Sequence, residues 1–185
     1  MRGRAEYAVP VDVHVILRRG SAGAPEFLLS RRAGPVYASG LWHLPSGRLD
    51  GPHEDVADAV IRETREETGV VVGRGDLRAA VTVHHRAPGG VARIGVFFET
   101  RRWRGEPRIM EPDRCDGMGW FGPAALPEPM VAYCWAGLDG YLTGAHVVTH
   151  FQHPGDPVAH RPGPDRTWAA ADAQIAGVGA EGPMP

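Results

Sequence analysis

Three glutamates near the middle of the sequence, Glu63, Glu66 and Glu67, have the type and spacing to bind a metal ion. The surrounding residues predict a helix from about Glu54 to Thr68, and at roughly 100° per residue the three carboxylates project within about one quadrant. Like charges at these spacings are mutually repulsive, and anions are disfavoured near the C-terminal end of a helix. A bound divalent cation removes both penalties, and Mg²⁺ prefers carboxylates, water and phosphates as ligands. The pattern therefore indicates a site for a hard divalent cation such as Mg²⁺.

The other sides of this helix indicate how it is positioned. One side is charged, and another is mildly apolar, which predicts packing against a sheet. The charged side holds Glu54, Asp58, Arg62 and Arg65, and the apolar side holds Ala57, Val60, Ile61, Thr64 and Thr68. An alternative is a solvent-exposed helix in which Arg62 and Arg65 pair with Asp58 or Glu54. The separation of the three glutamates from these arginines favours the metal site.

The stretch from Gly47 to Val70 closely resembles the Nudix box, G-x5-E-x7-R-E-U-x-E-E-x-G-U, in which U is a bulky apolar residue. The matching positions are Glu54, Arg62, Glu63, Glu66, Glu67, Gly69 and Val70. Two positions depart: Gly47 lies one residue too far from Glu54, which indicates a one-residue insertion, and Thr64 replaces the apolar residue. The resemblance implies the Nudix α/β/α sandwich, an α/β (α+β) fold with a mixed β-sheet flanked by helices. It also implies hydrolysis of a nucleoside diphosphate linked to another group, X.

The same resemblance implies roles for the box residues. Glu63, Glu66 and Glu67 would bind Mg²⁺, with Mn²⁺ as a substitute, to neutralise the diphosphate and to lower the pKa of the attacking water. Arg62 would orient these carboxylates without touching substrate, with Glu54 in its network. Glu54 is equally well explained as an acid favoured in the first turn of a helix.

The general base is either a box glutamate, Glu66 or Glu67, or an acid from a distant loop. The loop candidates are Glu111, Asp113 and Asp116. We prefer Glu111 because of its position before the short Trp-Phe strand expected at residues 120–121. The alternative is that these loop acids are simply solvated.

Candidate substrate-binding residues are Trp42, Gly47 and Arg93. Trp42 could stack on a base, although a Trp at a strand end is more often part of the core. Arg93 could bind phosphates through its guanidinium fork, or could be a solvated charge. The same two interpretations apply to Arg101, Arg102 and Arg104. We expect His84 and His85, which lie in a strand pattern, to be packed or exposed.

The remaining sequence predicts strands on both sides of the box helix and a second helix after them. The expected strands are Ala8–Leu17, Glu26–Ser30, one or two within residues 70–87, Val91–Thr100, Trp120–Phe121, and a late segment, His146–Phe151, that forms a strand or simply packs. The expected second helix is Pro129–Leu142, although Gly137 and Gly140 weaken it. Together these elements indicate a mixed sheet flanked by helices.

Length and composition limit the function. The chain has 185 residues and a net charge of −2, which favours one domain over residues 1–152 and argues against nucleic-acid binding. Cys115 and Cys134 are too few for a disulfide scaffold and lack zinc-ligand spacing. Without an apolar run typical of a signal peptide or membrane span, we expect a cytoplasmic protein with no membrane partner. Residues 153–185 are rich in Pro, Gly and Ala, and we expect them to form a flexible tail.

These observations favour a Mg²⁺-dependent pyrophosphohydrolase acting on a small nucleotide or diphosphate, with nucleoside triphosphates as the leading substrates because no further recognition module is evident. Two alternatives stay open. One is a nucleotide-sensing or interaction module that does not hydrolyse its ligand, and the other is an isoprenoid diphosphate isomerase, which needs a suitably placed cysteine. The sequence does not define the base, the X group, the attacked phosphorus, the number of metal ions or whether the chain forms a homodimer.

Overall fold

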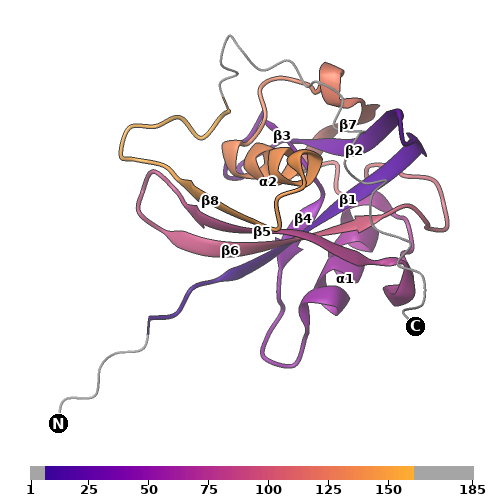
Figure 1. The fold of residues 1–185 in the computed structure, drawn as a ribbon, viewed down its shortest axis with the longest axis horizontal. Coiled ribbons are helices and arrows are strands. Elements are labelled where there is room, and N and C mark those ends of the chain that lie inside the picture. The colour runs from indigo at the N-terminus through magenta and orange to yellow at the C-terminus, as the bar shows by residue number, and fades with distance from the viewer. Residues whose placement is uncertain (1–6, 161–185) are drawn as a thin grey trace, which may run out of the picture.

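The computed structural model describes residues 7–160 of the chain, which form an eight-stranded mixed sheet and two longer helices (Figure 1). The strands are β1 (Val11–Ser21), β2 (Ala24–Arg32), β3 (Trp42–His43), β4 (Ser46–Arg48), β5 (Arg78–Arg86), β6 (Ala92–Thr100), β7 (Cys115–Phe121) and β8 (Val147–Phe151). The helices are α1 (Val56–Thr68) and α2 (Ala132–Thr143), with 3-10 turns at Arg74–Asp76 and Pro123–Ala125. No helix in this part of the chain is long and apolar enough to cross a membrane.

The sheet confirms the expected mixed architecture. Its strands run in the order β3-β2-β1-β6-β5-β8, with β4 beside β1 and β7 beside β2. The central strand, β1, is parallel to β6 and antiparallel to β2 and β4. At the far edge β8 pairs in parallel with β5, so the late segment whose sequence left two possibilities open is a strand.

The predicted elements are present with shifted ends. The first strand starts later than expected, at Val11, and continues to Ser21 because it forms a hairpin with β2. The Trp-Phe strand is longer than expected and begins at Cys115, since β7 pairs with β2 along its length. The second helix begins at Ala132, and residues 70–87 contain one strand, β5.

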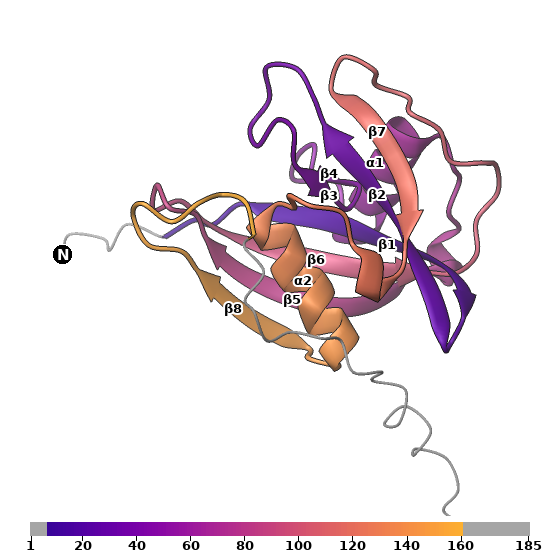
Figure 2. The ribbon, with the colours of Figure 1, turned by 90° about the horizontal axis from the view of Figure 1, so that it is seen from above.

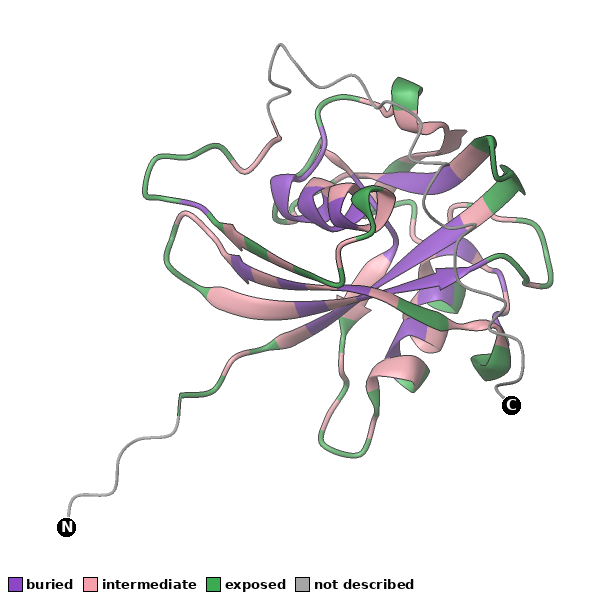
Figure 3. Cartoon of the chain, viewed as in Figure 1, coloured by how far each residue is buried: buried purple, intermediate pink, exposed green. Residues whose placement is uncertain are grey.

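Side chains of β1 alternate between two cores. Val13, Val15 and Leu17 pack in the core that includes α1 residues, whereas Ile16 belongs to the core that includes α2 residues. This alternation is the period of two expected of a strand covered on both faces. Figure 2 shows α1 and α2 on opposite sides of β1, and Figure 3 shows the buried residues concentrated along β1 and in α2. The three layers are therefore helix, sheet and helix.

Local sequence fixes both ends of α1. The Asp55 side chain accepts hydrogen bonds from the backbone N–H groups of Ala57 and Asp58, which caps the N-terminus. Gly69 ends the helix with φ 75°, a left-handed conformation that favours glycine, and donates its N–H to the Arg65 carbonyl. Both ends agree with the predicted helix to within two residues.

The buried side of α1 explains the departure from the box at Thr64. This residue is 1% exposed, and its hydroxyl donates to the Val60 carbonyl at 2.6 Å. The hydroxyl is therefore satisfied within the helix, and the β-branched side chain packs where a bulky apolar residue is usual. Thr68 repeats this arrangement by donating to the Thr64 carbonyl at 2.5 Å.

Residues that follow β8 return to α2. The Ala132 N–H donates to the Val158 carbonyl at 2.9 Å, and the His160 N–H donates to the Met130 carbonyl at 2.7 Å. The His160 ring also stacks on Trp135, with 3.7 Å between ring centroids. The beginning of the segment expected to be a flexible tail thus contacts the domain. The rest of that segment, residues 161–185, lies outside the described residues.

Candidate active site

The short strand β4 holds its backbone against the carboxylates of α1. The Ser46 N–H donates to Glu67 Oε2 at 2.9 Å, and the Arg48 N–H donates to Glu63 Oε1 at 3.2 Å. Between them, a Cβ atom added to Gly47 would overlap the Glu63 carboxyl group. Only glycine allows this close approach, which accounts for the glycine at the start of the box. Pairing between β4 and β1 fixes the position of this backbone.

The one-residue insertion lies in the loop between β4 and α1. Within this loop the Asp50 N–H donates to Glu54 Oε2 at 2.7 Å, and the Glu54 N–H reaches the Gly51 carbonyl at 3.4 Å. Gly51 has φ 152°, inside the region that favours glycine. The extra residue therefore changes the loop alone, because Gly47 still lies against Glu63 and the helix keeps its register.

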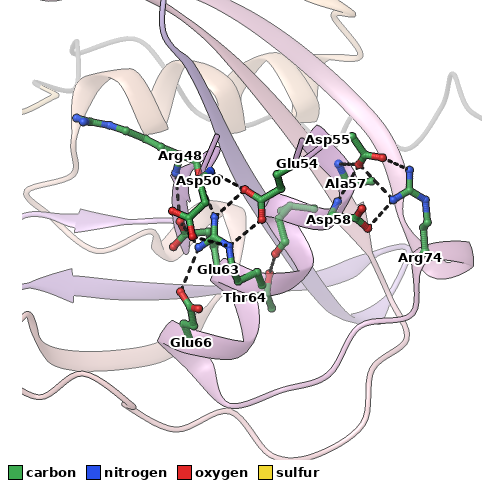
Figure 4. Close-up of polar contacts among 12 residues, drawn as sticks. Arg48, Asp50, Glu54, Asp55, Ala57, Asp58, Glu63, Thr64, Glu66 and Arg74 are labelled. Carbon is green, nitrogen blue, oxygen red and sulfur yellow. Dashed lines mark hydrogen bonds and ion pairs between the residues drawn. The ribbon is translucent and has the colours of Figure 1, made fainter. Parts of the chain in front are cut away.

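Arg62 connects the box carboxylates. Its Nε and Nη2 atoms donate to the two oxygens of Glu54 at 2.8 and 3.0 Å, and Nη2 also donates to the Arg48 carbonyl at 2.8 Å. Its Nη1 atom donates to Glu63 at 2.9 Å and to Glu66 at 3.2 Å. Figure 4 shows Glu54, Glu63 and Glu66 turned toward this common centre. The fixed fork of a guanidinium suits this arrangement, in which one side chain orients three carboxylates.

One expectation about the arginines is wrong. The periodicity of the helix placed Arg62 on a side away from the three glutamates, but its long side chain curls back to Glu63 and Glu66. Glu54 pairs with Arg62, as the alternative interpretation had it, but Asp58 pairs with neither Arg62 nor Arg65. Instead Arg74, from the 3-10 turn after the helix, contacts Asp55 at 2.7 Å and Asp58 at 2.6 Å (Figure 4).

The surroundings of the carboxylates disfavour negative charge. Burial raises the pKa of Glu63, against the opposing effect of Arg62. Burial raises the pKa of Glu67 to about 8, although the Ser46 N–H acts in the opposite direction and the residue keeps some exposed surface. The negative charge of Glu63 raises the Glu67 pKa further. Nearby positive charge would remove these penalties and hold both groups ionised.

The donor set fits a hard divalent cation in its chemistry. It consists of glutamate oxygens, which Mg²⁺ and Mn²⁺ prefer, and it includes Glu67, whose ionised form is disfavoured by burial. Within residues 7–160, no three His, Cys, Asp or Glu side chains already form a metal cage. Arg62 engages Glu63 and Glu66, and the Glu66 side chain is 54% exposed. These residues therefore suit a metal by type and location, while Arg62 neutralises part of their charge.

The loop between β6 and β7 brings Glu111 toward the box. The Arg108 N–H donates to the Thr68 carbonyl at 2.9 Å, and the Met110 N–H donates to the Glu67 carbonyl at 3.3 Å. Glu111 follows directly, and its negative charge contributes to the raised pKa of Glu67. The loop acid preferred on sequence grounds therefore lies within electrostatic reach of a box glutamate.

The other two loop acids have different surroundings. Asp116 pairs with Arg31 at 2.7 Å. Asp113 is exposed, and no hydrogen bond or ion pair of its side chain is found among the described residues. Neither acid is brought to the box in the way that Glu111 is.

The structure does not bring the expected substrate contacts Trp42 and Arg93 against the box glutamates. Trp42, on β3, packs edge-on against Phe121 with 5.1 Å between ring centroids and belongs to the edge of the core. Arg93, on β6, donates to Asp12 at 2.8 Å. The exposed arginines after β6 pair locally, Arg101 with Glu99 and Arg102 with Asp76. Gly47 is the one member of the expected set that contacts a box carboxylate directly.

Arg32, at the end of β2, is a charged residue near the box that sequence reasoning missed. Its Nε donates to the Tyr37 carbonyl at 2.7 Å, and its positive charge lowers the pKa of both Glu67 and His43. His43 is buried, with its Nδ1 atom 3.5 Å from the Ser46 hydroxyl, and burial lowers its pKa to about 3. The sequence offered one signal, an arginine pair where a strand enters a Gly-rich loop. That signal does not show which arginine turns inward.

Comparison with known proteins agrees with this geometry. A family model described as the NUDIX domain matches residues 9–135. The chain belongs to the Nudix family. It is similar to a MutT NUDIX hydrolase from Burkholderia pseudomallei, with 30% identity and a TM-score of 0.63 over 72% of this chain and 98% of that one.

Two more distant Nudix structures share the fold. A mutator MutT protein from Bacillus halodurans has 19% identity and a TM-score of 0.58, over 79% of this chain and 92% of that one. The NUDIX domain of Shewanella oneidensis NrtR, crystallised with ADP-ribose, has 22% identity and a TM-score of 0.52, over 66% of this chain and 78% of that one. Family membership, with all three box glutamates present, makes this chain a Nudix pyrophosphohydrolase.

Proposed function

We propose that this Nudix domain is a Mg²⁺-dependent hydrolase of a nucleoside diphosphate linked to X, with nucleoside triphosphates as the favoured substrates. The observation that carries the proposal is the environment of Glu67. Burial raises the pKa of its carboxyl to about 8, and two further acids, Glu63 and Glu111, act on it in the same direction. Three acids whose charges disfavour one another do not stabilise a fold, whereas a bound cation is stabilised by them.

Three carboxylates would hold the metal in this proposal: Glu63, Glu66 and Glu67. When bound, Mg²⁺ or Mn²⁺ supplies charge neutralisation for the diphosphate and a more acidic water. The chain itself supplies the position of the ligands, because Arg62 and the β4 backbone fix Glu63 and Glu67 against the sheet. Glu66 is the most exposed of the three side chains, and it alone lacks a backbone hydrogen bond from β4 among the described residues.

Two further residues serve the reaction in this proposal. Glu111 would accept a proton from the attacking water, with Glu66 or Glu67 as the alternative base. Arg32 would meet the polyphosphate, since its charge is close enough to lower the pKa of Glu67 and a guanidinium matches phosphate oxygens. Arg62 is already occupied by carboxylates and would position them without touching substrate.

The proposed substrate is a small nucleotide rather than a polymer. The net charge of −2 gives no general attraction for nucleic acid. A related NUDIX domain was crystallised with ADP-ribose, so nucleotide sugars belong in any substrate panel beside triphosphates. The free thiols of Cys115 and Cys134 suit the reducing cytoplasm, where we place the enzyme.

The isomerase alternative is disfavoured by both cysteines. Cys134 is buried, its sulfur accepts the Leu44 N–H at 2.9 Å, and burial raises its pKa to about 12. The Cys115 thiol donates to the Gly117 carbonyl at 3.3 Å, within its own strand. Neither contact places a cysteine beside the box carboxylates as a proton donor.

A substrate panel with Mg²⁺ or with a chelator tests the proposal. Triphosphates, nucleotide sugars and dinucleoside polyphosphates should be assayed by ³¹P NMR and mass spectrometry, which identify both products and separate hydrolysis from isomerisation. We expect metal-dependent hydrolysis that is lost in Glu66→Gln and Glu67→Gln and is retained in the control Glu106→Gln, an exposed acid of the β6–β7 loop. Metal-independent turnover would refute the proposal, and nucleotide binding without turnover would support a sensing module.

A further inference from the structure

Three of the four described side chains that have buried polar atoms without hydrogen-bond partners lie together between β1 and α2. Among residues 7–160 these unpartnered atoms are Asp12 Oδ1, both ring nitrogens of His14, Tyr133 Oη and Ser30 Oγ. Asp12, His14 and Tyr133 are 5%, 5% and 8% exposed. Leaving a buried polar group without a partner costs about 1–3 kcal/mol, so such atoms are rare in a structure optimised only for stability. Their concentration on three residues indicates a binding function.

Asp12, His14 and Tyr133 lie together under the N-terminal part of α2. Asp12 and His14 are two residues apart on β1 and therefore point to the same face. The His14 ring lies edge-on to Tyr133, with 5.1 Å between centroids. On the neighbouring strand, Gly95 pairs with Asp12, and a Cβ added to Gly95 would overlap the Tyr133 hydroxyl. This glycine leaves room for the hydroxyl beside the carboxylate.

The polar atoms of this cluster, which we call the β1–α2 subsite, are matched to a neutral ligand. Arg93 donates to Asp12 Oδ2 at 2.8 Å, so the Asp12 charge is balanced and Oδ1 remains an acceptor. The Arg48 guanidinium lies 3.9 Å from Oδ1, beyond hydrogen-bonding distance, and its side chain is 72% exposed. Burial keeps His14 neutral, because it lowers the pKa to about 3, so the ring offers one N–H donor and one acceptor nitrogen.

Aromatic rings pack against the two rings that carry these atoms. His14 stacks on Phe97 at 4.1 Å, with 4° between the ring planes, and Tyr133 stacks on His85 at 4.3 Å. Flat rings with a few directed donors and acceptors suit a planar heterocycle, whereas Asp12 Oδ1 is an acceptor, which a phosphate oxygen does not satisfy. A ligand group that donates to the carboxylate, such as an exocyclic amino group, satisfies Oδ1.

The β1–α2 subsite adjoins the proposed metal site. His14 pairs across the sheet with Ser46, whose N–H donates to Glu67 Oε2. His14 faces α2, whereas the box helix lies on the other side of β1, so one nucleotide would pass the edge strand β4 to place its phosphates at the box and its base at His14. We infer that Asp12, His14 and Tyr133 recognise the base of the substrate, and that they select a heterocycle bearing an amino group. This inference rests on the proposed function, since it assigns the base end of the same substrate.

Substitutions that keep an aromatic ring but remove its polar atoms test the inference without removing charge. Tyr133→Phe deletes one hydroxyl, and His14→Phe replaces both nitrogens while it keeps a ring that stacks on Phe97. The matched control is Tyr141→Phe on the same helix, whose hydroxyl donates to Glu99 at 2.9 Å and accepts from Arg18 at 3.1 Å. The readouts are kcat/KM for GTP and ITP, and for ATP and purine riboside triphosphate, because the members of each pair differ by one amino group.

We expect the wild-type enzyme to prefer the amino-bearing member of at least one pair by about 10-fold or more. Tyr133→Phe and His14→Phe should reduce this preference to near unity, because kcat/KM falls mainly for the amino-bearing member of the pair. Tyr141→Phe should keep the preference. Unchanged preference in both subsite variants, or no preference in the wild type, overturns the inference.

Binding of the corresponding nucleoside monophosphates in EDTA separates this inference from the proposed function. In one outcome hydrolysis fails, but the wild type binds GMP more tightly than IMP, or AMP more tightly than purine riboside monophosphate. If Tyr133→Phe abolishes that difference in affinity, the β1–α2 subsite is supported and the proposed reaction is refuted. If hydrolysis is intact and the subsite variants bind each pair as the wild type does, the reaction stands and the subsite falls.

Discussion

Replacing Glu67 by glutamine should stabilise the metal-free protein while it removes activity. Folding at pH 7.5 encloses a carboxyl whose pKa is raised to about 8 from an ordinary value of 4.5. About three pH units separate the ordinary pKa from the assay pH. For each of these units, keeping the carboxyl protonated in the folded state lowers the free energy of unfolding by about 1.4 kcal/mol. Because the residue keeps some exposed surface, we expect Glu67→Gln to raise the free energy of unfolding by about 2–4 kcal/mol in EDTA. The amide oxygen can still accept the Ser46 N–H.

The pH dependence of stability shows in which direction Glu67 acts. A raised pKa in the folded state adds stability that is complete below about pH 4.5 and is lost as the pH rises through about 8. Wild-type stability should therefore carry a component that falls over this range, and Glu67→Gln should lack it. The difference between the two proteins should vanish near pH 4.5 and grow toward pH 8, as measured by urea denaturation in EDTA at several pH values.

Glu66→Gln is the matched control for this experiment. Its side chain is 54% exposed, so we expect a change in stability within about 0.5 kcal/mol even though activity is lost. Mg²⁺ should raise the melting temperature of the wild type more than that of either variant. A destabilised Glu67→Gln protein, or one with the same pH dependence as the wild type, would refute the reasoning about the Glu67 environment.

Three other perturbations test separate parts of the site. Gly47→Ala places a methyl group on a box carboxyl, so kcat should fall about 100-fold or more, whereas the circular dichroism spectrum should be unchanged. Arg62→Gln removes its charged contacts to three carboxylates, and we expect a 10–100-fold loss in kcat or in Mg²⁺ affinity measured by calorimetry. Burial lowers the pKa of His14 and of His43 to about 3, so each should reduce the free energy of unfolding by about 2 kcal/mol as the pH falls from 7.5 to 5. Denaturation in the Glu67→Gln background removes the opposing contribution of Glu67, and a free energy of unfolding that does not change with pH there would contradict the prediction.

Sequence reasoning succeeded where periodicity and caps decide the structure. The ends of α1 follow from Asp55 and Gly69, whose side-chain chemistry and backbone freedom act locally. The mixed sheet follows from strands on both sides of that helix. The second helix differs, since more than half of the α2 residues are buried and two of these are glycines. The packing of α2 outweighs the weak helix propensity of its glycines. At Gly137, an added Cβ would overlap the Phe97 ring. The glycine therefore allows a close contact between α2 and the sheet, which helix propensity does not take into account.

Long side chains limited the prediction of the site. A helical wheel places the Cβ atom of Arg62 correctly but not its guanidinium, which lies several bonds away and reaches Glu63 and Glu66. Arg32 and His14 were missed for another reason: their neighbours come from strands far apart in the sequence, and only the sheet pairing brings them together. Trp42 was weighed as a stacking residue or a core residue, and it packs on Phe121 at the edge of the core.

The contacts of residues 158–160 bear on how this protein should be handled. The family match ends at residue 135, three residues into α2, yet backbone bonds from Met130 and Ala132 run to a segment more than twenty residues later. A shortened expression clone ending at residue 152 would expose the start of α2 and the face of Trp135 that His160 covers. Clones for crystallisation or binding studies should therefore extend at least through His160.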